Sequence, residues 1–302
     1  MKMNIKKIAA FGVAACCLFS TTACGKKECF HTYTSDVTKE ATCKEFGVTT
    51  YTCGLCGDSY TEDIAKIEKH IIEFGTCVIC GEFFPTEGIV YSVSEDNTYA
   101  EVIGYSGDDV AEMVIAPTYK GLPVERIADR AFTSSWATHV KNFHRVFIPD
   151  TVKVIGDCAF MYCTMKEVRL GKNVREIGRL AFYCRNLTKI NLPESLTLIG
   201  ESAFEDCKLS NIDIPSGVKI EEAAFVNCEL IHVTMGKDCI LSDFIFNVNH
   251  ELTEINFQGT KKEWELMNKS YSWNKDGRIA SSFYSAPKNL RQIICIDGII
   301  TL

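Results

Sequence analysis

The sequence has little positive charge and lacks the common catalytic motifs. Its 302 residues include 32 Lys and Arg against 39 Asp and Glu, a formal net charge of -7. Nucleic-acid-binding proteins present a basic face that neutralises phosphates, so this balance argues against such a partner. There is no G-x-S-x-G elbow, no P-loop and no H-E-x-x-H pair, and no Asp is placed to orient His232. We therefore expect no enzyme activity.

Long apolar runs are also scarce, and the main one lies at the N-terminus. Lys2, Lys6 and Lys7 precede an apolar stretch over residues 8–20. This stretch is too short to span a hydrocarbon core of ~30 Å as a helix. It predicts a secretory signal peptide over residues 1–23, removed on export. No later segment is long and apolar enough to cross a membrane, so we expect an exported protein without a spanning helix.

The residues around Cys24 resemble a bacterial lipobox. Residues 21–24 read Thr-Thr-Ala-Cys, and the polar Gly-Lys-Lys follows. The resemblance implies cleavage before Cys24 and a lipid on its sulfur, with residues 24–28 as lipidated N-terminus and linker. The protein would then be anchored to the outer face of the bacterial cell membrane. Two alternatives stay open, namely a lipobox ending at Cys16 and an ordinary signal peptide that leaves Cys24 free.

Residues 29–84 form a small module rich in cysteine and histidine. With few large aliphatic residues, a segment of this size cannot stabilise itself by burial alone and needs a covalent or metal staple. Two Cys-x2-Cys pairs show the spacing of zinc ribbons, and each is followed by a glycine that allows a tight turn. The candidate ligands are Cys53, Cys56, Cys77, Cys80, Cys43, His31, His70 and Cys29. We expect a structural zinc site, because ligands are in excess of the three that a catalytic zinc keeps.

The sequence leaves the arrangement of these ligands open. In one interpretation the two Cys-x2-Cys pairs share a single zinc. Residues 31–70 also resemble a short module of bacterial surface proteins. That resemblance implies one site of Cys43, Cys53 and Cys56 with one histidine, and a second built from the other Cys-x2-Cys pair, the other histidine and Cys29. A disulfide framework and a redox-active pair remain alternatives in an exported protein.

A sequence repeat of about 22 residues dominates the rest of the chain. It is marked by the recurrence of an Ala-Phe pair at Phe160, Phe182, Phe204 and Phe225. A fixed period of this length predicts a solenoid. Each repeat combines an alternating segment suited to a short strand, as in residues 187–193, with a V-x-x-I-G-x-x-A-F segment. We expect Ile, Ala and Phe to face inward, the glycine to permit a tight turn, and the strands to stack in a parallel sheet ~4.8 Å apart.

These repeats resemble the BspA-type leucine-rich repeat family. Its consensus runs close to L-x-x-I-x-I-P-x-x-V-x-x-I-G-x-x-A-F-x-x-C, and the resemblance covers most of residues 85–302. It implies a mainly β leucine-rich-repeat solenoid with a parallel sheet on its concave face. Gly171 and Gly236 replace the proline, and Cys184 lies one position early relative to Cys163, Cys207 and Cys228. We expect Cys163, Cys207 and Cys228 to form a buried ladder of free thiols. Disulfides between neighbouring coils are the alternative.

Solenoids need caps, and both ends of this one carry turn and helix signals. Residues 89–93 and 99–103 alternate around a polar turn and predict a hairpin. At the other end, residues 259–264 resemble the closing signature of the family, with Thr260 as N-cap and Glu263 completing a capping box. Asp297-Gly298 between apolar runs predicts a second hairpin. An insertion over residues 133–144, with Trp136, His139 and His144, is expected to bulge from one face.

The strand residues that flank the buried positions offer a candidate ligand-binding face. They are Glu167, Arg169, Lys189, Asn191, Asn211, Asp213, His232, Thr234, Glu254 and Asn256. The array is polar and poor in aromatic residues, which favours a protein ligand over stacking on sugars. The family resemblance implies binding or adhesion, with a host or neighbouring-cell surface protein as partner. A plain solvated face on a structural spacer or envelope component is the alternative, and an enzyme accessory subunit is a more remote one.

Overall fold

The structure is a computed structural model that describes residues 30–133, 142–267 and 289–302. Its internal contacts define two compact units, residues 1–70 and 71–302. The predicted signal peptide and Cys24, together with Cys29, Trp136 and His139, lie outside the described residues. Within the described ranges, no helix is long and apolar enough to cross a membrane.

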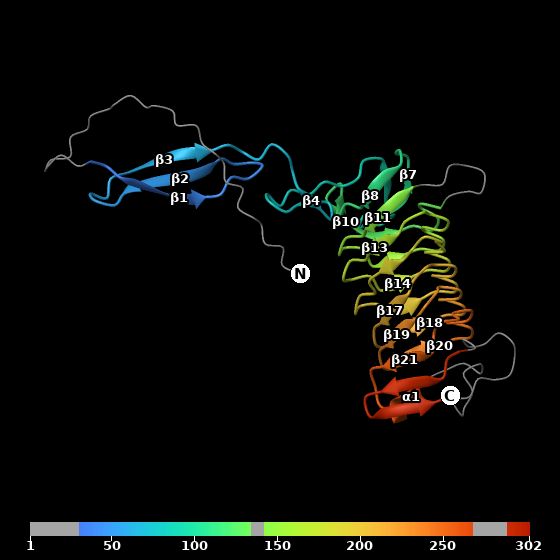
Figure 1. Ribbon diagram of the computed structural model, residues 1–302. Helices are drawn as coiled ribbons and strands as arrows, with labels where there is room; N and C mark the ends of the chain where they lie inside the picture. Colours follow the sequence, from blue (N-terminus) through green and yellow to red (C-terminus); the bar gives the residue numbers. More distant parts are fainter. Residues whose placement is uncertain (1–29, 134–141, 268–288) are drawn as a thin grey trace. The chain divides into compact units, whose positions relative to one another are not determined.

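The first unit is a three-stranded antiparallel sheet in the order β1-β2-β3 (Figure 1). Its strands are β1 (Tyr33–Lys39), β2 (Gly47–Cys53) and β3 (Ser59–Ile64). Tyr51 and Tyr60 are cross-strand partners whose rings stack 4.8 Å apart. Within residues 30–70 the only buried apolar side chain is that of Cys53. Burial therefore stabilises this unit very little, which agrees with the expected need for a staple.

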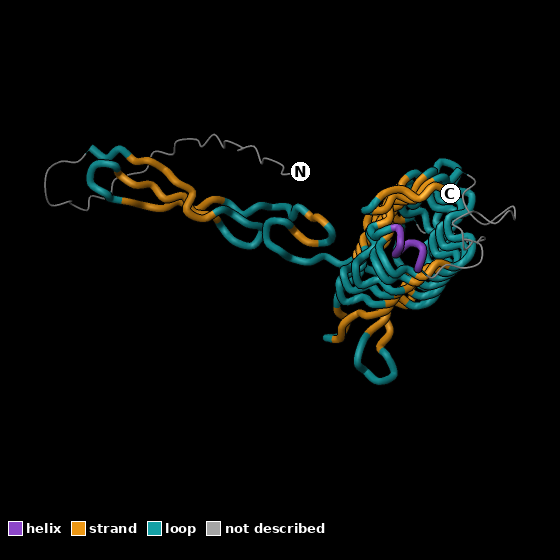
Figure 2. Tube along the Cα trace, turned by 90° about the horizontal axis from the view of Figure 1, so that it is seen from below, coloured by secondary structure: helices purple, strands orange, loops and turns teal. Residues whose placement is uncertain are grey.

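The second unit is a solenoid built almost entirely of short parallel strands. Figure 2 shows successive coils of this unit lying over one another. One side of the coils carries a sheet in the order β20-β18-β16-β14-β12-β10-β7-β6, and the other side carries the sheets β15-β13-β11-β8 and β17-β19-β21-β22-β23. The mainly β solenoid predicted from the repeats is confirmed.

The bounds of its elements follow the repeat. The first side comprises β6 (Ile89–Val93), β7 (Ala100–Tyr105), β10 (Leu122–Ile127), β12 (Val154–Ile155), β14 (Glu176–Ile177), β16 (Leu198–Ile199), β18 (Lys219–Ile220) and β20 (Ile240–Leu241), with β9 (Thr118–Tyr119) beside β10. The other side comprises β8 (Val110–Val114), β11 (Phe143–Phe147), β13 (Glu167–Arg169), β15 (Lys189–Ile190), β17 (Asn211–Ile214), β19 (His232–Met235), β21 (Glu254–Phe257), β22 (Gln292–Cys295) and β23 (Gly298–Thr301). A short hairpin of β4 (Ile72–Glu73) and β5 (Thr76–Cys77) precedes them, and α1 (Lys261–Leu266) follows β21. His144 lies on β11 rather than in the expected insertion.

A column of phenylalanine rings forms the centre of the solenoid. The rings of Phe132, Phe160, Phe182, Phe204, Phe225 and Phe246 stack on one another at centroid distances between 4.8 and 5.7 Å. The backbone adds to this stacking, because the amide of Phe182 donates to the carbonyl of Ala203 one coil later at 2.8 Å. The five central rings from Phe160 onward are fully buried. The inward orientation predicted for the Ala-Phe pair is confirmed.

The glycine of each Ile-Gly pair has a different role from the expected one. A Cβ on Gly178 or Gly200 would lie 2.7 Å from the backbone of the preceding coil. These glycines do not have positive φ, whereas Leu180 and Ser202 do, at 51° and 52°. The expectation that glycine permits the tight turn is therefore wrong. Glycine allows two coils to approach closely, and a non-glycine residue makes the turn at a cost of about 1–2 kcal/mol.

Cys163, Cys207 and Cys228, for which the sequence predicts a ladder, are buried, and Cys184 lies buried among them. The Sγ atoms of Cys163, Cys184, Cys207 and Cys228 each donate to the carbonyl of the phenylalanine one coil earlier, at 3.2, 3.0, 3.1 and 2.9 Å. Cys184 makes this bond despite its shifted sequence position. Burial raises the pKa of Cys207 to about 12, so its thiol stays protonated and able to donate.

Asn249 takes the place of a cysteine at the end of this ladder. It is fully buried, and its Oδ1 accepts from the amides of Cys228 at 3.1 Å and Leu230 at 2.9 Å. Its Nδ2 donates to the carbonyls of Phe225 at 2.8 Å and Phe246 at 2.9 Å. One side chain thus satisfies four buried backbone groups on neighbouring coils.

Both predicted caps are present. β6 and β7 form an antiparallel hairpin, as do β22 and β23. Thr260 caps α1, and its side chain and that of Glu263 complete the capping box. The Thr260 amide, followed by the Lys237 ammonium, lowers the pKa of Glu263 to about 2. Trp264 is buried against Phe257, so α1 closes the end of the core.

We expect Asn249→Ala to lower the free energy of unfolding of the solenoid by at least about 3 kcal/mol, because each buried backbone group left without a partner costs about 1–3 kcal/mol. Asn186→Ala is the matched control, since Asn186 is exposed and its loss is expected to cost less than about 0.5 kcal/mol. Chemical denaturation of both variants provides the measurement. Equal losses for the two variants would contradict the role of Asn249.

Candidate metal centres and binding face

The two Cys-x2-Cys pairs form the same type of turn. In the first, the Gly57 amide donates to the Cys53 carbonyl at 2.9 Å, and Gly57 has a φ of 77°. In the second, the Gly81 amide donates to the Cys77 carbonyl at 2.9 Å, with a φ of 71° at Gly81. Here positive φ explains the glycines, as the sequence predicts. Each turn brings two thiols onto one side of a short loop.

The first group of candidate ligands is His31, Cys53 and Cys56. Their ligand atoms all lie within 4.8 Å of one another, and the Sγ of Cys56 is 3.4 Å from the Nδ1 of His31. Backbone N–H groups of Leu55 and Cys56 point at the Cys53 sulfur and lower its pKa to about 6. Cys53 is therefore largely a thiolate at neutral pH, the form that binds a metal.

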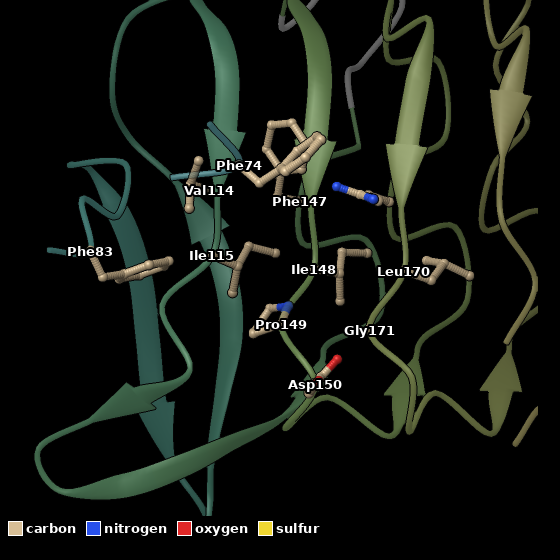
Figure 3. Close-up of a pocket in the computed structure, with 11 residues that line it drawn as sticks. Phe74, Phe83, Val114, Ile115, Phe147, Ile148, Pro149, Asp150, Leu170 and Gly171 are labelled. Atoms are coloured by element: carbon tan, nitrogen blue, oxygen red, sulfur yellow. The ribbon is translucent and has the colours of Figure 1, made fainter. Parts of the chain in front are cut away.

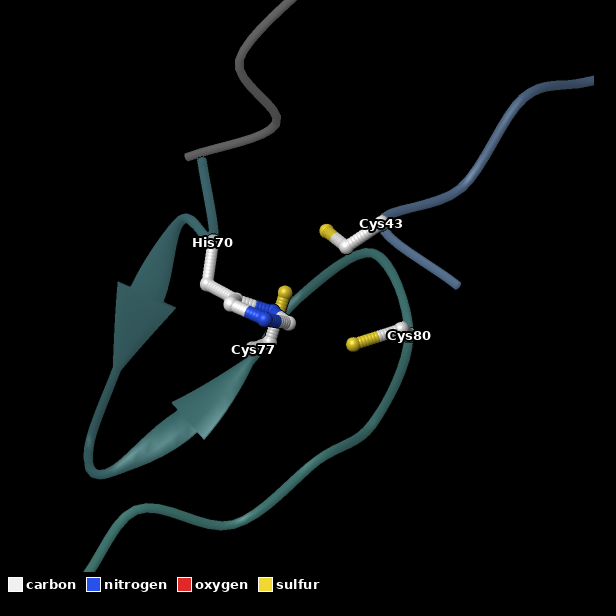
Figure 4. A group of neighbouring side chains, drawn as sticks. All are labelled: Cys43, His70, Cys77 and Cys80. Atoms are coloured by element: carbon white, nitrogen blue, oxygen red, sulfur yellow. The ribbon is translucent and has the colours of Figure 1, made fainter. Parts of the chain in front are cut away.

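The second group is Cys43, His70, Cys77 and Cys80 (Figure 4). The three sulfurs and one imidazole nitrogen also lie within 4.8 Å of one another. Cys77 is buried and the other three are half-buried. Three thiols and one imidazole make a donor set typical of tetrahedral structural zinc, so the residues fit the metal predicted from the sequence.

The grouping differs from each arrangement that the sequence offers. Cys53 and Cys56 do not share a group with Cys77 and Cys80, and Cys43 joins the second pair rather than the first. Each group contains one histidine, as the two-site interpretation predicts. No disulfide joins cysteines within the described ranges. Spacing along the chain reveals the two turns, but it cannot tell which distant cysteine joins each of them.

The ten residues predicted for the binding face lie on the outer side of the strands, which we call the strand face. Buried residues such as Val168, Ile212 and Val233 alternate with them and point into the core. Several members have partners within the face. Lys189 Nζ lies 2.9 Å from Glu167 Oε1, Gln292 donates to Glu254 at 2.7 Å, and the Asn191 side chain bonds the backbone of Leu170.

The later coils of the strand face hold an open patch, which we define as Asn211, Asp213, His232, Thr234 and Asn256. Asn211 is the register partner of His232, while Asp213 is that of Thr234 and Thr234 that of Asn256. The first three are exposed and the last two are half-buried. Among the described residues no ion pair involves Asp213, so its carboxylate is accessible to a partner.

The repeat region is similar to leucine-rich repeat proteins. The profile of the BspA type leucine rich repeat region matches in six copies, over residues 122–232 and 182–268. The crystal structure of a leucine rich repeat protein of T. pallidum is similar over 65% of this chain and 90% of that chain, with 25% identity and a TM-score of 0.51. No curated protein sequence matches the chain.

Two further solved structures are more distant. A leucine-rich repeat protein of Bacteroides ovatus has 18% identity, covers 71% of each chain and gives a TM-score of 0.40. The pneumococcal vaccine antigen PcpA has 23% identity, covers 59% of this chain and 50% of that chain, and gives a TM-score of 0.48.

We expect the purified chain to bind two equivalents of zinc, one at each group, because both offer soft ligands in close approach. Cys56→Ser removes a ligand from the first group and should reduce the stoichiometry to one. Cys295→Ala is the control, since Cys295 is buried in β22 and belongs to neither group, and its loss should leave two equivalents. Elemental analysis after removal of loosely bound metal measures the stoichiometry, and a metal-free chain with a mass change on reduction would contradict the metal sites.

Proposed function

Because its repeat region belongs to the BspA-type leucine-rich repeat family, we propose that the chain is an exported binding protein that recognises a partner protein through its strand face. Proteins of this family are commonly surface adhesion or binding proteins, and the leucine-rich repeat fold is typically a non-enzymatic binding module. The observation that supports this proposal most strongly is the open patch. Its hydrogen-bonding groups are regularly spaced and are not all consumed by contacts within the face.

The composition of the open patch favours a protein partner. It lacks aromatic side chains, which are the usual platforms for sugar rings. Its amide, hydroxyl, imidazole and carboxylate groups offer both donors and acceptors to a polypeptide. Short side chains on a sheet lose little conformational entropy when a partner binds. A host or neighbouring-cell surface protein is the partner class that the family suggests.

The cysteine-rich residues have a structural role in this proposal. The first unit buries little apolar surface, so a metal held by His31, Cys53 and Cys56 would supply much of its folding free energy. The second group would do the same for the β4–β5 hairpin. A bound zinc ion would supply no chemistry in these sites beyond holding the ligands together. Chelation should therefore unfold the first unit.

The N-terminal sequence supports anchoring to the membrane. A signal peptide over residues 1–23 and lipidation at Cys24 would place the solenoid at the cell surface, where proteins of this type are typically found. Metabolic labelling with a radioactive fatty acid tests the anchor. Label should appear in the wild-type chain and disappear in Cys24→Ser, and label that persists in the variant would contradict this assignment.

We expect Asp213→Arg to weaken binding to a protein partner at least tenfold, a change of about 1.4 kcal/mol, because it puts a long cation on the open patch in place of an exposed carboxylate. Glu176→Arg is the matched control, as Glu176 is equally exposed but lies on β14 on the other side of the coils. Immobilised wild type and variants are tested against a panel of purified extracellular proteins. Absence of binding by the wild type, or equal effects of both variants, would favour a structural spacer.

A further inference from the structure

The outward side of the first coils, next to the strand face, carries two apolar residues beside the ion pair of Glu112 and Arg145. Val114, Phe147 and Arg169 are register partners on β8, β11 and β13. Val114 and Phe147 face outward, yet they are only 5% and 6% exposed. The later strands carry polar residues at the outward positions, as at Asp213 and Thr234. Something must therefore cover the apolar start of the face.

The β4–β5 hairpin provides that cover. The ring of Phe74 packs edge-to-face on Phe147 at 5.0 Å. Gly75 lies so close to Val114 that a Cβ on Gly75 would be 2.4 Å from its Cγ1. The backbone of Phe84 closes the loop by donating to the Gly75 carbonyl at 2.7 Å. Residues 71–84, which the sequence groups with the cysteine module, thus pack on the solenoid.

This cover is incomplete and leaves a pocket of about 210 Å³ beside it (Figure 3). Its walls are mostly apolar and come from the hairpin and from the ends of β8, β11 and β13. The lining residues are Phe74, Phe83, Val114, Ile115, Phe147, Ile148, Pro149, Asp150, Arg169, Leu170 and Gly171. Drug-sized ligands and cofactors occupy about 300–1,000 Å³, so this volume suits a single residue.

Arg169 gives the pocket one cationic side. Its guanidinium carbon lies 3.7 Å from the centroid of the Phe74 ring. Stacking of this kind occupies the flat face of the guanidinium and leaves its N–H donors, which lie in the plane, directed outward. Among the described residues, no carboxylate lies within ion-pair distance of Arg169. The guanidinium group of Arg169 is therefore held in place by Phe74, and its N–H donors are available to an anion.

The acid in the lining is already engaged. Asp150 accepts from the Lys172 amide at 2.9 Å, and its other oxygen lies 3.0 Å from the Lys172 ammonium. These contacts lower the pKa of Asp150, the amide contributing most. Asp150 therefore stays ionised and its charge is balanced by Lys172. Among the described lining residues, Arg169 is the cation without an ion-pair partner.

We propose that this pocket binds the carboxyl-terminal residue of a partner polypeptide, with the apolar side chain between the walls and the carboxylate on Arg169. An α-carboxylate and its side chain leave the same carbon atom, so both fit a volume of one residue. An acidic side chain would belong to a different residue from the apolar one and would need more room. Carboxylates match the planar guanidinium fork through two parallel hydrogen bonds. The inference rests on the proposed function, since it names one subsite of the strand face.

The test uses the full chain and a fluorescent pentapeptide, Gly-Gly-Ser-Gly-Leu, with a free carboxyl terminus. Binding is measured by fluorescence anisotropy. The same peptide ending in a carboxamide should bind at least about tenfold more weakly, because it loses a charge-assisted bond. Replacing the terminal leucine by glycine should weaken binding comparably, because it removes the buried apolar group. Equal binding of acid and amide, or no binding of the acid, would overturn the proposal.

Variants assign the effect to the pocket. Arg169→Gln should weaken binding of the free acid at least about tenfold, and it should remove the difference between acid and amide. Arg175→Gln is the matched control, since Arg175 is exposed just before β14 on the other side of the coils. Circular dichroism shows whether Arg169→Gln stays folded. If it does not, Arg169→Lys should still lose affinity, because lysine keeps the charge but not the fork.

The outcomes separate this proposal from the broader one. If a partner protein loses affinity with Asp213→Arg but binds Arg169→Gln normally, the strand face is a binding face and the pocket is not part of it. If free N-acetyl-leucine binds as tightly as the peptide, the occupant is a small carboxylate rather than a polypeptide terminus, and the proposal fails.

Discussion

Stacking of each coil on the next is the interaction on which the solenoid depends. A single coil has too little apolar surface on either side to stay folded, and its neighbours supply the rest. The phenylalanine column, the thiol-to-carbonyl bonds and the close backbone approach at Gly178 and Gly200 all act along the same axis. Since the ends of a stack have no further neighbour, the hairpins and α1 are required to close it.

Because stacking depends on the inward residues, the outward residues of the strand face are available for binding. Because the core is formed by residues that point inward, the outward positions can vary without loss of stacking. In the later coils they carry the polar open patch. In the first coils they include the apolar Val114 and Phe147, and the β4–β5 hairpin packs on these two residues and leaves the pocket beside Arg169. One side of the solenoid thus presents two chemically different surfaces.

Most of the fold could be predicted from the sequence, because every repeat places the same kinds of residue at the same inward positions. The spacing of Phe160, Phe182 and Phe204 fixes the inward side of every coil, and the capping signals are local. The sequence fails where distant segments meet. Nothing near Cys43 shows that it joins Cys77 rather than Cys53, and nothing near Phe74 shows that it packs on Phe147. The hydrogen bond from Cys184 to the Phe160 carbonyl could not be predicted either. Cys184 lies one position early in its repeat, and the loop conformation compensates for this shift.

Native-state hydrogen exchange of the phenylalanine amides tests the central claim most directly. If stacking holds the solenoid together, the amides of Phe160, Phe182, Phe204 and Phe225, each bonded to the adjacent coil, should exchange together and only through global opening. Their apparent opening free energies should agree within about 1 kcal/mol and exceed those of β1–β3. Independent exchange of single coils, with much lower protection at one of these amides, would contradict the claim.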